Sequence, residues 1–147
     1  MKVYLFLIAS LSFSTAFAAG NIEGSWKLKT VSCKSGVALS ARSFAALQEG
    51  LSLNLKDGKA VLTTTYEKVC SLTLSGDYVI SGNHIIYTNL VISFGAGCGQ
   101  MTGKTQSAPN DSGTFKVSAT SLTLEDPSTD GSTCPVGDVE IEVYEKI

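Results

Sequence analysis

The chain has 147 residues, a formal net charge of −2 and a 44% content of hydrophobic residues, which suffices for one domain with a core of its own. Its 11 basic residues include a single arginine, Arg42, and form no basic run. Nucleic acid and anionic membrane surfaces are therefore not expected partners, because binding to either depends on clustered Lys and Arg.

The N-terminal segment has the pattern of a secretory signal peptide. Lys2 precedes an apolar run from residue 3 to 13, and Ala16 and Ala18 are spaced as signal peptidase requires. We expect residues 1–18 to be the signal peptide and residues 19–147 to be a secreted or periplasmic domain. We expect no membrane anchor, since the run is shorter than the roughly 20 residues that span a bilayer and the first cysteine, Cys33, does not directly follow the cleavage site.

The rest of the chain is predicted to be all-β. Apolar and polar residues alternate between turn signals, as in half-buried antiparallel strands, and only residues 40–48 are predicted to form a short helix, within the first long connection. The eight expected strands are residues 22–32, 50–56, 59–66, 70–80, 84–94, 112–118, 121–126 and 137–146.

Asp57-Gly58 is the strongest hairpin signal in the chain. A two-residue loop there opposes Leu55 with Ala60 and Leu53 with Leu62, so the apolar side chains share one face. Around residues 119–120, the same reasoning opposes Phe115 with Leu124 and Val117 with Leu122.

The hairpin at residues 81–83 is ambiguous in length. A two-residue loop opposes Tyr78 with Tyr87 and leaves Ile86 and Leu90 on the polar face, whereas a three-residue loop opposes Tyr78 with Ile86 and Leu74 with Leu90. Because one face of each strand is buried, matching the faces favours three residues.

The last strand is predicted to direct Val139, Ile141 and Val143 inward, and Glu140 and Glu142 into solvent. The consecutive acidic residues Glu125 and Asp126 are likewise expected on the outer face. No charged side chain is expected inside. The expected inward set is Trp26, Leu28, Leu51, Leu53, Leu55, Leu62, Thr64, Tyr66, Leu72, Leu74, Tyr78, Ile86, Leu90, Ile92, Phe115, Val117, Leu122, Leu124, Val139, Ile141 and Val143.

Eight consecutive antiparallel strands form either a sandwich or a closed up-and-down barrel. The connections alternate between tight turns, at residues 57–58, 81–83 and 119–120, and mostly long loops. Alternate connections of a meander lie at opposite ends, so this alternation favours an eight-stranded antiparallel up-and-down β-barrel with one tightly closed end.

Four cysteines in an exported chain indicate two disulfides. Every gap between them exceeds the short spacings of zinc sites, so we expect no metal. Cys70 begins one strand and Cys98 follows its neighbour, while barrel closure brings Cys33 near Cys134. We therefore expect the pairs Cys33–Cys134 and Cys70–Cys98, both at the long-loop end.

The early Gly24-Ser25-Trp26 motif, the long first connection and the seven further strands resemble the lipocalin-like (calycin-type) family of small barrels. In that family the tryptophan closes the barrel floor and a basic residue of the last strand packs across it. The resemblance assigns these structural roles to Gly24, Trp26 and Lys146. The chain has no clear Thr-Asp-Tyr motif and has Lys in place of Arg in the last strand, which favours a shorter bacterial-type member.

Such a barrel is either filled by side chains or holds one small ligand. We expect a binding protein for a small hydrophobic molecule, open at the disulfide end, and a monomer without a cofactor. The alternative is an inhibitor whose rim loops block a secreted protease or lysozyme. No catalytic residues are expected, because the only histidine, His84, lies beside a tight turn. The candidate ligand-binding residues are Thr64, Tyr66, Leu72, Leu74, Tyr78, Leu90, Ile92 and Phe115.

Overall fold

The fold was analysed in a computed structural model that describes residues 21–39, 50–66 and 69–147. In these ranges it consists of strands and one short 3-10 turn. The elements are β1 (Gly24–Cys33), β2 (Ser52–Lys56), β3 (Lys59–Tyr66), β4 (Cys70–Ser81), β5 (His84–Phe94), η1 (Gly99–Met101), β6 (Thr105–Ser107), β7 (Asp111–Val117), β8 (Ser121–Pro127) and β9 (Val139–Lys146).

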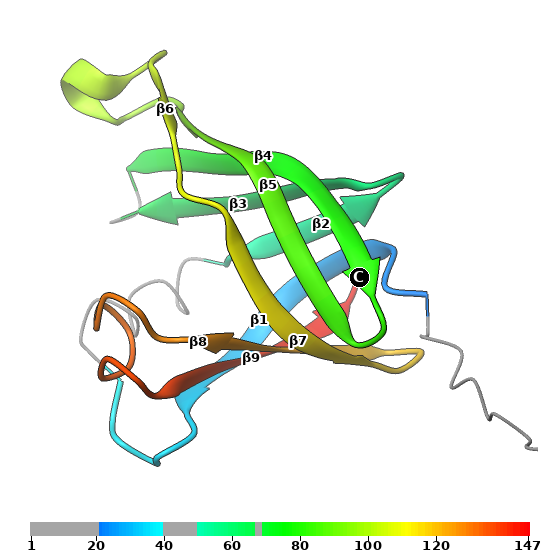
Figure 1. Ribbon diagram of the computed structural model, residues 1–147. Coiled ribbons are helices and arrows are strands. Elements are labelled where there is room, and N and C mark those ends of the chain that lie inside the picture. Colours follow the sequence, from blue (N-terminus) through cyan, green and yellow to red (C-terminus); the bar gives the residue numbers. More distant parts are fainter. Residues whose placement is uncertain (1–20, 40–49, 67–68) are drawn as a thin grey trace, which may run out of the picture.

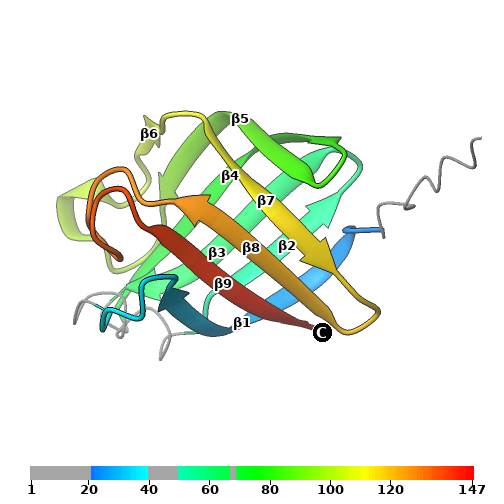
Figure 2. The ribbon, with the colours of Figure 1, turned by 60° about the horizontal axis from the view of Figure 1, so that its bottom comes forward.

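The strands form one closed antiparallel barrel (Figure 1). Neighbouring strands follow the order β4-β3-β2-β1-β9-β8-β7-β5, and a further pairing of β4 with β5 completes the cylinder. The first and last strands therefore lie side by side, which Figure 2 shows clearly. The eight expected strands and the closed barrel are confirmed, and the short β6 pairs with β5 as an additional strand.

Two of the three tight hairpins have the expected register. Asp57 and Gly58 both have positive φ, 50° and 73°, as the mirror-image turns of hairpins require. Leu55 opposes Ala60 and Leu53 opposes Leu62 across β2 and β3. Between β7 and β8, the pairs Phe115 with Leu124 and Val117 with Leu122 are also confirmed.

The β4–β5 hairpin corrects the expected three-residue loop. Ser81 pairs with His84, so the loop has two residues, and Tyr78 opposes Tyr87 instead of Ile86. The register then shifts at a bulge in β5, where Asn89 has a φ of 54°. The extra residue that brings the apolar faces of β4 and β5 together therefore lies in β5 and not in the turn. Ile86, which was expected to point inward, is 38% exposed.

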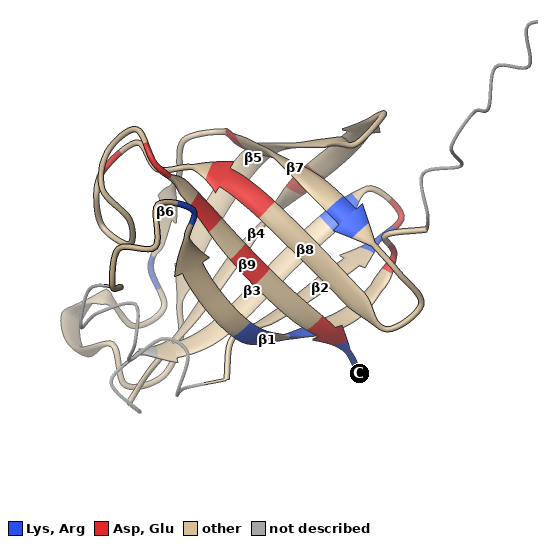
Figure 3. Cartoon of the chain, turned by 90° about the horizontal axis from the view of Figure 1, so that it is seen from below, with Lys and Arg blue, Asp and Glu red and all other residues tan. Residues whose placement is uncertain are grey.

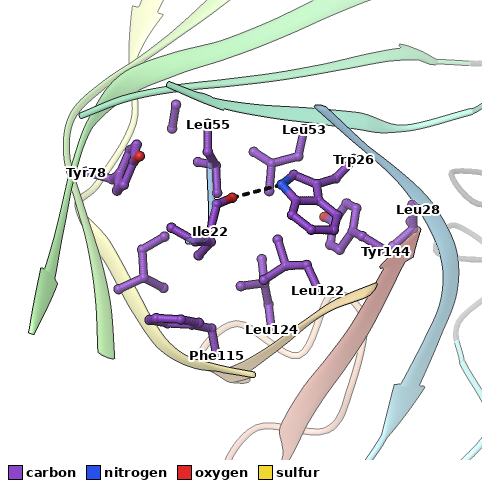
Figure 4. Packing of buried hydrophobic residues seen from close by; sticks show 12 residues of the cluster. Ile22, Trp26, Leu28, Leu53, Leu55, Tyr78, Phe115, Leu122, Leu124 and Tyr144 are labelled. Carbon is purple, nitrogen blue, oxygen red and sulfur yellow. Dashed lines mark hydrogen bonds between the residues drawn. The ribbon is translucent and has the colours of Figure 1, made fainter. Parts of the chain in front are cut away.

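The tight-turn end of the barrel is closed by packed side chains (Figure 4). Trp26 is completely buried, and its indole N–H donates a hydrogen bond of 3.0 Å to the carbonyl oxygen of Ile22. Lys146 opposes Trp26 across β1 and β9, and its ammonium lies 5.3 Å from the ring centroid. Gly24 has a φ of 149°, and a Cβ there would lie 3.1 Å from Lys146 Cε, so glycine leaves room for this lysine.

The opposite end carries the disulfides Cys33–Cys134 and Cys70–Cys98, and both expected pairings are confirmed. Disulfides persist in oxidising compartments, which indicates an extracellular or periplasmic environment. The expected signal peptide at residues 1–18 and the expected helix at residues 40–48 lie outside the described residues. Within the described ranges, no helix has the length and apolar character needed to cross a membrane.

Candidate ligand-binding cavity

A cavity of about 620 Å³ lies inside the barrel, above the closed end. One wall is apolar and comes from strands β2 to β5, with Leu53, Leu62, Leu74 and Leu90 among its residues. The outer part is lined by residues 108–112 and 127–130, several of which are exposed. The cavity therefore reaches solvent beside the loop between β8 and β9, which contains Cys134 of the Cys33–Cys134 disulfide.

The opposite wall carries acidic side chains, because β9 presents the face that was expected outside. Tyr144 opposes Leu28 and is completely buried, while Glu142 opposes Val31 and Glu140 opposes Cys33. Alternation along β9 places Glu140 and Glu142 in the cavity lining. The residues expected inward, Val139, Ile141 and Val143, take the other face, and the expectation of an uncharged interior was wrong.

Asp126 of β8 is a second correction. It continues the inward face of Leu122 and Leu124 and lines the cavity, whereas it was expected on the outer face. Its Oδ1 atom is enclosed and has no hydrogen-bond partner. A Cβ on Gly113 would lie only 1.7 Å from this oxygen, so the missing side chain at residue 113 makes room for the carboxyl group.

The neighbouring Glu125 shows the contrast between the two faces of β8. Its carboxylate points outward, as expected, and forms ion pairs with Lys116 at 3.1 Å and with Lys34 at 3.7 Å. These contacts, chiefly with Lys116, hold the pKa of Glu125 below its usual value. No such cation lies among the side chains that line the cavity.

Burial dominates the titration of the cavity carboxyl groups. Burial raises the pKa of Asp126 to about 7, and the negative charges of Asp111 and Glu140 add to the shift. Burial also raises the pKa of Glu142 to about 7, against the opposing effect of a hydrogen bond from the Tyr144 hydroxyl. The pKa of Glu140 is raised for the same primary reason. Desolvation and like charges both disfavour the ionised carboxylate.

Two tyrosine hydroxyls complete the polar part of the cavity. The Tyr144 hydroxyl donates a hydrogen bond of 2.7 Å to Glu142 Oε2. Burial, followed by the nearby carboxylates, raises the pKa of both Tyr87 and Tyr144 above the ordinary value for tyrosine. Both hydroxyls are therefore protonated near neutral pH, and Tyr144 donates its single hydroxyl proton to Glu142.

The structure brings only part of the expected ligand-binding set to this cavity. Leu74 and Leu90 line it, whereas Tyr78 and Phe115 belong to the core at the closed end. Three further candidates, Thr64, Leu72 and Ile92, lie on paired strands β3, β4 and β5 but are not among the lining residues. Tyr66 ends β3 opposite Cys70, and its side chain is outside the described part.

Sequence reasoning missed polar residues that line the cavity from β5, β8 and β9, among them Tyr87, Asp126, Glu140, Glu142 and Tyr144. Two signals were present. Counting two residues on from the inward Leu124 gives Asp126, and counting back in twos from Lys146 gives Tyr144, Glu142 and Glu140. The second signal follows from the contact with Trp26 assigned to Lys146. Every second residue of a strand lies on the same face, so Tyr144, Glu142 and Glu140 share the face of Lys146.

Within the described ranges, no group of three or more His, Cys, Asp and Glu side chains is arranged to hold a metal ion. His84 pairs with Ser81 at the tight turn and is not among the cavity residues. The arrangement is suited to holding a molecule with an apolar part and a polar part.

The fold is a closed eight-stranded antiparallel β-barrel, and a cavity lies inside it. Comparisons with protein-family models, with curated proteins and with solved structures find no match to the chain. The closed eight-stranded antiparallel barrel is consistent with the lipocalin-like resemblance.

Proposed function

We propose that this protein is an exported, non-catalytic binding protein that holds a small hydrophobic molecule inside its barrel. The observation that carries the proposal is the cavity of about 620 Å³ with leucines from four adjacent strands on one wall. Pockets of this size, apolar with a few polar groups, are typical of small-molecule sites.

The finer assignment, a lipocalin-like protein of bacterial type that is secreted or periplasmic, is part of the same proposal. The contact between Trp26 and Lys146 beside Gly24 supports it, as do the two disulfides, which favour an oxidising compartment. We propose a monomer, with no nucleic-acid partner and no cofactor.

Titration with Nile red, a neutral dye whose emission reports an apolar environment, tests ligand binding. We expect saturable binding at a ratio of one dye per chain. Leu74→Trp fills part of the cavity and is expected to weaken binding by about tenfold or more. Val79→Trp is the matched control, since Val79 lies on the same strand and is 58% exposed. Failure of the wild type to bind, or equal binding by both variants, would contradict the proposal.

Inhibition of a secreted enzyme is the second candidate function. It is favoured by exposed valines at or near the disulfide-held end, since Val37, Val69 and Val136 are 50%, 63% and 70% exposed. Val136 lies two residues from Cys134, which fixes its loop to β1. Inhibition of a lysozyme or of a protease in a panel assay, abolished by Val136→Asp, would support this function, and no inhibition across the panel would count against it.

A further inference from the structure

The two walls of the cavity differ in chemistry. Strands β2 to β5 contribute leucines, whereas β8 and β9 contribute Asp126, Glu140 and Glu142. Asp126 directly opposes Glu140 across β8 and β9, and Glu142 lies one inward position further down β9, opposite Leu124. Figure 3 shows the acidic segments of these two strands side by side.

The carboxylates on this wall have no cationic partner in the described part of the chain. The ion pairs found there involve Glu145, Glu125 and Asp77 on the outer surface. Oδ1 of Asp126 is enclosed without a hydrogen-bond partner, and Glu142 accepts a hydrogen bond only from Tyr144 of its own strand. Buried charges are normally paired, and the described residues of the chain place no positive group beside this wall.

We propose that the cavity binds an organic cation, a protonated amine on an apolar body, whose ammonium contacts Asp126 and Glu142 while the apolar body packs on Leu62, Leu74 and Leu90. This proposal rests on the proposed binding function and names the ligand class. An organic cation fits better than a metal ion for two reasons. Within the described ranges, the carboxyl groups are not arranged as a metal site, and the wall opposite them is apolar.

The proposal has a consequence for pH dependence. The acidic and phenolic groups that face the cavity are Asp111 of β7, Asp126 of β8, Glu140, Glu142 and Tyr144 of β9, Tyr87 of β5 and Asp130 of the rim loop. Because the pKa values of Asp126 and Glu142 are raised to about 7, both groups are largely protonated at pH 5 and ionised at pH 8. An alkylamine stays protonated across this range, so its affinity increases as pH rises.

Displacement of Nile red by octylamine, octanol and octanoate tests the preference for a cation. At pH 8 we expect octylamine to bind about 10- to 100-fold more tightly than octanol, as charge-assisted hydrogen bonds predict, and octanoate to bind most weakly. At pH 5 the amine and the alcohol are expected to converge.

Substituting each carboxyl group by the corresponding amide tests whether Asp126 and Glu142 are responsible for the preference for the amine. Glu142→Gln and Asp126→Asn are expected to remove most of the preference for octylamine over octanol. Their matched controls are Glu145→Gln on β9 and Glu125→Gln on β8, which remove one negative charge from the outer surface. These controls are expected to keep the wild-type preference, and circular dichroism checks that all four variants fold.

The outcomes separate the ligand class from the binding function. Equal binding of amine, alcohol and carboxylate by a protein that still binds Nile red would overturn the cation proposal and leave the binding function standing. Displacement of octylamine by millimolar calcium chloride at constant ionic strength would overturn it in favour of a metal site. Absence of both dye and amine binding would overturn the binding function together with this inference.

Discussion

Asp126 and Glu142 are the residues that distinguish this barrel from one filled by apolar side chains. Both lie on inward faces, where an ionised carboxylate loses hydration. Each is balanced between its protonated and ionised forms near pH 7. Gly113 supports the arrangement, because any side chain there would collide with Asp126. Acidic side chains at inward positions are expected in a binding site rather than in a packed core.

The raised pKa values predict that the ligand-free protein is less stable at pH 8 than at pH 5. Unfolding returns Asp126 and Glu142 to their ordinary values, 3.8 and 4.5. Between about pH 4 and pH 7 the folded protein therefore binds more protons than the unfolded chain, and the free energy of unfolding falls as pH rises. We expect a loss of about 1–3 kcal/mol, measured by urea denaturation at the two pH values.

The variants serve as the control for this pH effect. Glu142→Gln combined with Asp126→Asn is expected to flatten the dependence between pH 5 and pH 8, while Glu125→Gln keeps it. The lowered pKa values of Asp77, Glu125 and Asp138 belong to half-buried carboxylates outside the cavity, and they affect stability only below about pH 5. A wild-type stability that rises from pH 5 to pH 8 would refute the burial of the two carboxyl groups.

In most strands, the alternation of apolar and polar residues correctly predicted which side chains point inward. The prediction failed in β9, where the more apolar face is not the inward one. In β7 and β8 the inward residues Phe115, Leu122 and Leu124 are buried as expected. In β9 the apolar residues Val139, Ile141 and Val143 were predicted to point inward, because the apolar face of a strand is usually the buried one. That rule does not hold for a strand whose inward face lines a cavity with polar groups. The buried Tyr144 and the contact of Lys146 with Trp26 determine its orientation instead.

The bulge in β5 could not be located from the sequence. A longer turn and a bulge in the strand both return the apolar side chains that follow to the inward face of β5. The structure places the extra residue at Asn89, whose side-chain amide donates a hydrogen bond of 2.8 Å to Asp77. Asn is one of the few residues other than glycine that adopt positive φ readily. The bulge then allows both Tyr87 and Leu90 to line the cavity.

Substitution of Asn89 tests the bulge. Asn89→Val is expected to destabilise the protein by about 1–2 kcal/mol or more, because a β-branched residue is strained at positive φ. Asn89→Gly is expected to be milder. Thr88→Val, at the adjacent position, is the control and should change the free energy of unfolding little. Equal stability of Asn89→Val and Thr88→Val in denaturant titrations would show that β5 does not contain this bulge.

For the whole molecule, loop lengths and cysteine positions were sufficient to predict the barrel and its disulfides, since closure constrains which ends can meet. The cavity was not predictable in the same way. Its volume depends on how far the side chains of β2 to β5 reach toward β8 and β9, and its outer part is formed by residues 108–112 and 127–130. Those rim segments have no periodic pattern from which a position can be derived.

The two disulfides are expected to differ in effect. Cys33–Cys134 spans 101 residues and Cys70–Cys98 spans 28, so replacing the first pair by alanine should cost about 1 kcal/mol more in stability on the loop-entropy model. Ser128, which lines the cavity, donates a hydrogen bond of 2.6 Å to the carbonyl of Cys134. Loss of the first pair should therefore also weaken Nile red binding.

Loss of Cys70–Cys98 serves as the comparison, since residues 95–104, the rim segment that contains Cys98, do not line the cavity. Denaturant titration and dye titration of the two double variants separate stability from binding. Weaker dye binding after loss of Cys70–Cys98 alone would contradict the position of the cavity mouth.

The presence of two acidic groups inside the barrel is the central claim, and carboxyl ¹³C NMR titration of the ligand-free protein tests it most directly. We expect two resonances with midpoints near pH 7, as the burial of Asp126 and Glu142 requires, with one lost in Asp126→Asn and the other in Glu142→Gln. Because the two groups interact, removing either is expected to lower the midpoint of the other. Titration of every carboxyl group below about pH 5, as for solvated side chains, would contradict the account.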